Sequence, residues 1–160
     1  MIDSNADSLS MTIIQSSVAD RLCQLLADNQ TLTLKTHNYH WNVTGPLFGQ
    51  LHALFDEQYN DTNDAADVIA ERLRALGYPA PGSFADYGAR TKIMEAGTAR
   101  IPALKMVADL ERDNRTLTED AIAVVVAGTA AGDQASVNIA VERQYAHQKS
   151  AWKLRMYLEL

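Results

Sequence analysis

Four long stretches of this chain repeat apolar residues at helical spacing, and short breaks separate them. The stretches cover approximately residues 9–42, 47–76, 98–127 and 133–158. Glycine or proline residues mark the breaks, as expected where helices end. No segment shows the sustained period-2 alternation of a half-buried strand. The sequence therefore predicts an all-α fold, with the long helices arranged as a four-helix bundle.

The same periodicity predicts which faces turn toward the core and where the domain begins. The apolar faces comprise Ile14, Val18, Leu22, Leu25 and Leu32; Leu51, Phe55, Ala66, Ile69, Leu73 and Leu76; and Val137, Val141, Tyr145, Gln148, Trp152 and Met156. Thr98 is the candidate cap of the third stretch, with Pro102 in its opening turn. The connection over 77–97 is long for a bundle and is expected to hold a short helix near 83–89. We expect a flexible segment at 1–8 and one bundle domain at 9–160.

Composition and charge restrict the function classes. The 160 residues carry a net charge of −6, and residues 1–20 contain three aspartates but no lysine or arginine. This argues against broad electrostatic binding to nucleic acid, which requires cationic side chains against phosphates. No apolar run approaches a membrane helix, and the N-terminus lacks the pattern of a secretory signal. A single cysteine, Cys23, excludes an internal disulfide, fits a reducing cytoplasm and is expected to pack in the core.

The residues that can ligate a metal cluster in the first half of the chain. His40 lies near the end of the first predicted helix, and the second carries the i,i+4 pairs His52/Asp56 and Asp67/Glu71. Imidazole and carboxylate together are typical ligands of borderline or hard transition metals. At about 100° per residue, the four side chains on the second helix form a stripe roughly 130° from its apolar stripe. They are therefore not expected to point into the centre of their own bundle.

The helical rise separates the two pairs along the chain. Their midpoints are 15 residues apart, or roughly 22 Å at about 1.5 Å per residue. Metal–ligand bonds measure only ~2.0–2.2 Å, so one metal centre cannot use both pairs from one helix. In a twofold dimer, an antiparallel copy of the helix would bring His52/Asp56 of each subunit beside Asp67/Glu71 of its partner. The dimer would then contain two equivalent sites. The alternative is an ordinary solvated helix face with scattered charges.

The sequence predicts the positions of the other histidines and of the tryptophans less specifically. His37, one turn before His40, is expected around the site or at the surface, and His147 is expected to be packed or at the surface. Trp41 and Trp152 are expected in the core or at an interface. Trp41 would lie close to a metal held by His40.

The motif around these residues resembles the Dps family, the DNA-binding proteins from starved cells, which are mini-ferritins of the ferritin-like superfamily. The matching run is His37-Asn38-Tyr39-His40-Trp41-Asn42-Val43-Thr44-Gly45-Pro46-Leu47-Phe48, continued by His52, Phe55-Asp56-Glu57, Asp67, Ala70-Glu71-Arg72 and Leu76-Gly77. The resemblance covers about residues 20–158. It implies a ferritin-like four-helix bundle, a homo-oligomeric shell of twelve subunits, and a ferroxidase that oxidises Fe(II), preferably with hydrogen peroxide rather than dioxygen. It also implies storage of ferric mineral in the shell, which protects DNA from oxidative damage.

Carried over by position, the resemblance makes His40, His52 and Asp56 the iron ligands from one subunit. Asp67 and Glu71 become the ligands from its twofold partner. Zn²⁺ suits the same ligands. Ordinary ferritins usually carry Glu-x-x-His pairs directed into the bundle, and no glutamate in this chain has a histidine three residues later.

The chain also departs from the family pattern. Members that coat DNA often use a Lys- or Arg-rich tail, which neither end of this chain has, so we expect weak or absent DNA binding. The alternative function is a non-enzymatic shell that compacts the nucleoid. The cytoplasm is the expected location, with nucleoid association left open. Asn138 stands where the family often has a pore aspartate, and Asp133 and Glu142 are the flanking candidates for an Fe(II)-attracting field.

Overall fold

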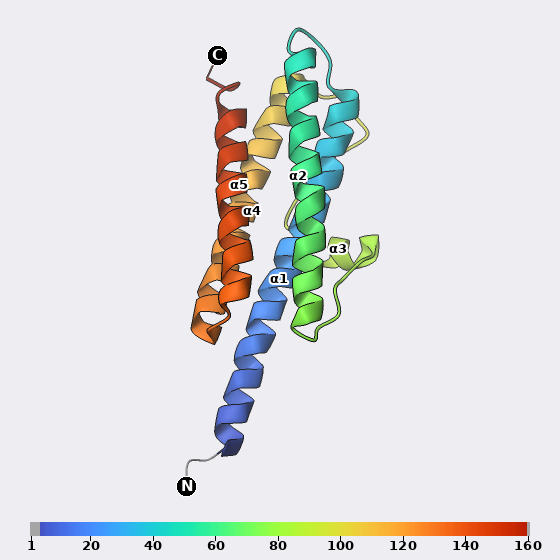
Figure 1. The fold of residues 1–160 in the computed structure, drawn as a ribbon. Coiled ribbons are helices and arrows are strands. Elements are labelled where there is room, and N and C mark those ends of the chain that lie inside the picture. The colour runs from blue at the N-terminus through green and yellow to red at the C-terminus, as the bar shows by residue number, and fades with distance from the viewer. Residues whose placement is uncertain (1–3, 160) are drawn as a thin grey trace.

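The computed structural model describes the backbone of residues 4–159 and the side chains of residues 16–159. Its helices are α1 (Ser4–Asn42), α2 (Phe48–Ala75), α3 (Phe84–Arg90), α4 (Ala103–Ala131) and α5 (Gln134–Arg155). The chain forms two antiparallel hairpins, α1 with α2 and α4 with α5, which pack side by side (Figure 1). The long α2–α4 connection carries α3 against α1 and returns the chain to the end where α2 began (Figure 1). The predicted all-α bundle with a short helix in this connection is confirmed.

Both predicted ends of α4 were wrong. Thr98 does not cap the helix; α4 begins at Ala103, after Pro102 in an extended conformation. The helix also continues through the predicted break to Ala131, where Gly132 adopts a left-handed conformation with φ of 67°. Gly128 is helical and lies where α5 comes close. A Cβ at this position would stand 2.8 Å from a methyl group of Val137. This glycine permits close helix packing and does not end a helix.

The N-terminal boundary also differs from the expectation. Helix α1 begins at Ser4, earlier than the expected start near residue 9. Residues 1–3 and the side chains up to residue 15, including Ile14, lie outside the described part of the structure. The expected flexibility of residues 1–8 therefore stays a prediction.

The core faces predicted for α1 and α2 are confirmed. Val18, Leu22, Leu25 and Leu32 of α1 are buried, as are Leu51, Phe55, Ala66, Ile69 and Leu73 of α2, while Leu76 is half-buried. They belong to two hydrophobic clusters, one around Phe55, Leu117 and Leu154, the other around Leu22, Ile69 and Val124. Burial of these side chains supplies the main driving force for folding.

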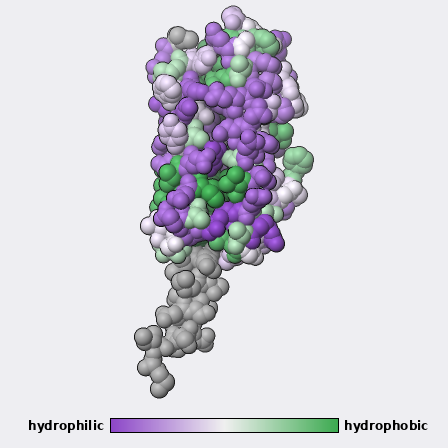
Figure 2. Space-filling view, viewed as in Figure 1, coloured by the Kyte–Doolittle hydropathy of each residue, from purple (hydrophilic) through white to green (hydrophobic). Residues whose placement is uncertain are grey.

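The prediction for α5 was wrong. Its apolar stripe faces outward: Val141, Tyr145 and Trp152 are each about half or more exposed, at 49%, 67% and 54%. Gln148 and Met156 are exposed as well, and Val137 is half-buried. The buried face consists instead of Ser136, Ala140, Arg143, His147, Ala151 and Leu154. Three of these six side chains are small, and α5 comes close to α4 at Gly128. Hydrophobic side chains gather in a patch on an otherwise mostly hydrophilic face of the bundle (Figure 2).

A buried ion pair ties α1 to α4. The Nζ of Lys35 lies 2.6 Å from a carboxylate oxygen of Asp113, and both side chains are almost fully buried. The same ammonium donates a hydrogen bond to the backbone carbonyl of Met94 in the connection before α4. Nearby, the Tyr39 hydroxyl donates to Asp109, and burial together with the Asp109 charge raises the pKa of Tyr39 well above its usual range. These contacts fix the register of two helices and the connection between them.

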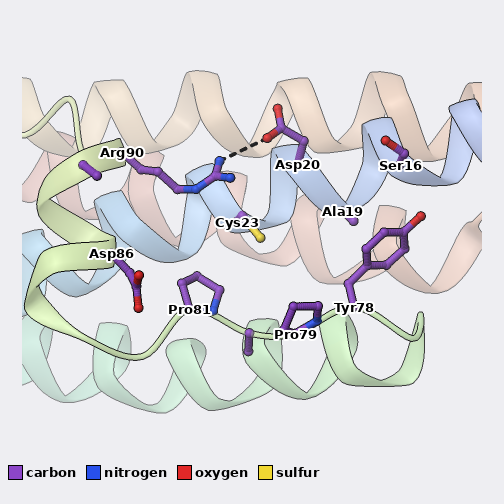
Figure 3. Close-up of a pocket in the computed structure, with 11 residues that line it drawn as sticks. Ser16, Ala19, Asp20, Cys23, Tyr78, Pro79, Pro81, Asp86 and Arg90 are labelled. Atoms are coloured by element: carbon purple, nitrogen blue, oxygen red, sulfur yellow. Dashed lines mark hydrogen bonds and ion pairs between the residues drawn. The ribbon is translucent and has the colours of Figure 1, made fainter.

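Cys23 lies beside a pocket between α1 and the segment after α2 (Figure 3). The thiol packs against the second hydrophobic cluster, as expected, but it is half-buried and not fully enclosed in the core. Burial raises the pKa of Cys23, so the thiol stays protonated near neutral pH. An ion pair between Arg90 and Asp20, 3.0 Å long, closes one side of the pocket (Figure 3). Within the described residues, no helix is both long and apolar enough to cross a membrane.

Candidate metal centre

His40 and His52 meet where α1 turns into α2. The turn passes through Gly45, whose φ of 99° favours glycine, and brings the end of one helix beside the start of the next. The two rings stack with centroids 3.7 Å apart and planes inclined by 20°. Each Nδ1 lies 2.9 Å from the backbone carbonyl oxygen of the other histidine. The two rings are thus held by reciprocal hydrogen bonds.

These hydrogen bonds fix the tautomer of both histidines. A carbonyl oxygen only accepts, so each Nδ1 must carry the proton and donate it. In the neutral rings, each Nε2 then keeps its lone pair. Histidines that bind metals usually hold one ring nitrogen to a carbonyl or carboxylate in this way, which orients the other nitrogen toward the metal. Both side chains are half-buried, so the pair presents two oriented nitrogen donors at the surface of the subunit.

Asp56 lies one turn beyond His52 on α2, and a tyrosine holds its carboxylate. The Tyr59 hydroxyl donates to Oδ1 of Asp56 over 2.9 Å. This hydrogen bond raises the pKa of Tyr59, so the phenol remains a proton donor at neutral pH. The Tyr59 ring stacks on His37 with centroids 4.0 Å apart, and His37 in turn packs against Trp41 at 4.0 Å. His37 therefore lies around the site, one of its two expected places.

Tyr59 is the residue that sequence reasoning missed. Its spacing of three from Asp56 is a recognisable signal, since residues i and i+3 are neighbours on a helix surface. Trp41 was expected in the core or at an interface; in the single subunit it is 61% exposed and packs against His37. It is not a core residue.

Asp67 and Glu71 stand apart from the histidines. Both are exposed on α2, and α2 is continuous from Phe48 to Ala75, so the rise of roughly 22 Å between the two pairs holds. Asp67 lines an open pocket of about 600 Å³ formed with residues of α1 and α3. Among the residues with described side chains, no group of three or more His, Cys, Asp and Glu side chains could hold a metal ion. One subunit brings His40 and His52 together, but it does not add Asp67 and Glu71 to them.

The candidate pore residues have other partners in the subunit. Asp133 caps α5 through the backbone N–H of Ser136 and pairs with Arg72 at 2.6 Å, which offsets much of its charge. Asn138 is exposed and accepts a hydrogen bond from Gln134. Glu142 is exposed, with its carboxylate 3.6 Å from Arg143. Of the two predicted carboxylates, Glu142 keeps the more accessible charge.

Known proteins resemble this chain along nearly all of its length. The family model of the ferritin-like domain matches residues 19–160. Antigen TpF1 from Treponema pallidum is 34% identical over 139 residues, which cover 87% of this chain and 78% of that protein. A DNA protection during starvation protein from Brevibacillus brevis is 31% identical, over 92% of this chain and 99% of its own length. The solved structure of Dps from Staphylococcus aureus superposes with a TM-score of 0.87 at 30% identity, covering 91% of this chain and 97% of that one.

Proposed function

Because the chain belongs to the Dps family of ferritin-like proteins, we propose that it is a cytoplasmic ferroxidase and iron store. The ferritin-like fold expected from the sequence is confirmed by the same comparisons. In this proposal, twelve subunits form a shell, Fe(II) is oxidised at sites between twofold-related subunits, and ferric mineral collects inside. The observation that carries the proposal is the reciprocal pair of His40 and His52, whose Nδ1 hydrogen bonds leave both Nε2 atoms free to bind iron.

The proposed iron site combines ligands from two subunits. His40, His52 and Asp56 come from one subunit, and Asp67 and Glu71 come from the partner subunit. Two observations support this division: the separation of the two pairs along α2, and the position of all four side chains outside the core, half-buried or exposed. Mixed nitrogen and oxygen donors suit iron, and Zn²⁺ would bind the same set.

Iron is the substrate, and the ligands favour its oxidation. Carboxylates stabilise Fe(III) more than Fe(II) because the attraction grows with the charge on the ion. Two ferrous ions bound close together give one electron each to one hydrogen peroxide, which takes up two protons and leaves as two water molecules. Paired delivery avoids the one-electron reduction that releases hydroxyl radical. Removal of both Fe(II) and peroxide would protect DNA without contact with it.

The test is to load the assembled protein anaerobically with Fe(II) and then add peroxide or dioxygen. We expect fast appearance of ferric absorbance, faster with peroxide, and iron that elutes with the shell on gel filtration. A rate equal to that of Fe(II) in buffer would contradict the proposal.

Tyr59→Phe is expected to weaken metal binding without changing any proposed ligand. The variant loses the hydroxyl that holds Asp56 but keeps the ring that stacks on His37. Loss of such an outer hydrogen bond typically costs 10–100-fold in metal affinity, so we expect a weakening of about 10-fold or more. Titration with Co(II), followed by its visible absorbance, measures the affinity. Tyr145→Phe, at an exposed tyrosine on α5, is the matched control. Equal affinity of wild type and Tyr59→Phe would remove Tyr59 from the site.

The second candidate, a nucleoid-compacting shell without enzymatic activity, is favoured only by the names of relatives that protect DNA. The net charge of −6 opposes it. We expect no shift of linear DNA in a gel at low salt and neutral pH. Tight binding under these conditions would refute this expectation and revive the second candidate.

A further inference from the structure

Four buried polar side chains, one from each long helix, lie in the interior of the bundle. They are Asn29 of α1, Gln58 of α2, Asn114 of α4 and His147 of α5, here called the core polar layer. Each is at least nine-tenths buried. None is among the proposed iron ligands, and the hydrophobic effect alone would favour apolar side chains at these positions.

Ion pairs and a hydrogen bond place Gln58, Asn114 and His147 at one level of the bundle. Arg143, one turn before His147 on α5, pairs with Asp61, three residues after Gln58 on α2. Lys153 pairs with Glu57, which ties the same two helices on the other side of His147.

Helix α4 joins at this level through a direct contact, because His147 Nδ1 lies 2.9 Å from Oδ1 of Asn114. Asn29 of α1 lies about one turn farther along the bundle, where its Nδ2 donates to the backbone carbonyl of Thr62.

Four atoms of the layer have no hydrogen-bond partner in the described protein. They are Asn29 Oδ1, both amide atoms of Gln58, and His147 Nε2. Buried polar atoms are nearly always paired with protein or with ordered water, because loss of hydration without replacement is unfavourable. The three such atoms of Gln58 and His147, at one level of the bundle, therefore indicate a ligand.

The hydrogen-bond types define what that ligand must offer. Asn114 donates its amide N–H to the carbonyl of Leu110, so its oxygen faces His147 and Nδ1 of His147 donates to it. His147 Nε2 is then an acceptor, as are Asn29 Oδ1 and Gln58 Oε1, while Gln58 Nε2 donates. The ligand must donate to two or more acceptors and accept from one donor. Water has this capacity, and buried waters typically make about three hydrogen bonds.

A metal ion does not fit the same layer, although four-helix bundles elsewhere build metal sites in their cores. The three acceptors are neutral, and the layer holds no carboxylate. The nearby carboxylate of Asp61 is already paired with Arg143, one turn from His147. A divalent cation would be buried without the anionic ligands that offset its loss of hydration.

We propose that the core polar layer holds an internal water, bound by His147 Nε2 and the Gln58 amide. The site is distinct from the proposed iron site. The interior of the bundle is then hydrated at this level.

A high-resolution crystal structure of the assembled protein soaked in Zn²⁺, with diffraction data collected at the zinc edge, tests the proposal. We expect an ordered water within hydrogen-bond distance of His147 Nε2 and Gln58, without anomalous signal. A zinc peak in the layer, or a direct Gln58–His147 hydrogen bond with no water, would overturn it. Zinc at His40 and His52 is read from the same map and tests the iron site separately.

Gln58→Leu tests whether the Gln58 amide binds the water. It removes the only unpaired donor and one acceptor, so the water density beside His147 should disappear while the shell still assembles. Persistence of the water unchanged would also overturn the assignment. If the variant does not assemble, the wild-type map still decides.

Discussion

Replacement of both His52 and Asp56 by alanine should slow peroxide-driven Fe(II) oxidation by about 100-fold or more, since loss of even an outer-shell partner costs 10–100-fold. The two residues supply one nitrogen and one carboxylate ligand of the proposed site. His40 should keep its orientation in this variant, because it donates to the backbone carbonyl of residue 52 and not to its side chain. Stopped-flow absorbance after anaerobic Fe(II) loading measures the rate. Both side chains are half-buried and lie outside the hydrophobic clusters, so assembly should persist.

The control for this variant is Asp64→Ala, which removes an exposed carboxylate from the same helix. Light scattering establishes that all three proteins assemble. Equal oxidation rates in wild type and the double variant would remove His52 and Asp56 from the site.

Lys35→Met should cost about 3–5 kcal/mol of folding stability, the typical cost of removing one partner of a buried ion pair. In the variant, Asp113 stays buried, and the cationic partner it keeps is Arg112, whose side chain is mostly exposed. It also removes the hydrogen bond to the carbonyl of Met94. Denaturant unfolding followed by circular dichroism measures the loss as a shift in midpoint at constant slope.

Lys153→Met is the matched control, because its pair with Glu57 has a similar length but a much more exposed carboxylate. Partly exposed pairs contribute about 0–1 kcal/mol, so this variant should unfold near the wild-type midpoint. Equal losses in the two variants would contradict the role given to burial. Neither lysine is a proposed iron ligand, so these variants separate stability from activity.

The sequence predicted the fold because helical periodicity was strong where helices bury a wide apolar face. In α2 the ends came within one residue, and Leu51, Phe55 and Ile69 were buried as expected. The same wheel placed His52, Asp56, Asp67 and Glu71 outside the core stripe, and all four are exposed or half-buried. Repeat spacing alone was sufficient for these results.

Other features depended on contacts that spacing does not encode. The stripe of Val141, Tyr145 and Trp152 was detected, but periodicity cannot tell whether an apolar face meets its own bundle or faces outward. Gly128 was taken for a break because a glycine that ends a helix and one that admits a neighbouring helix look alike in sequence. The reciprocal hydrogen bonds of His40 and His52 require the turn geometry that places two helix ends together.

The central claim is that each iron site is divided between two subunits, and co-assembly of two inactive variants tests it most directly. One variant lacks His52 and Asp56, and the other lacks Asp67 and Glu71; each should be inactive alone. In shells formed from equal amounts, half of the dimers pair unlike subunits, and each such dimer holds one complete site of two. We therefore predict recovery of about one quarter of the wild-type rate. If correctly assembled mixed shells oxidise iron no faster than either variant alone, the ligands are not shared and the account is contradicted.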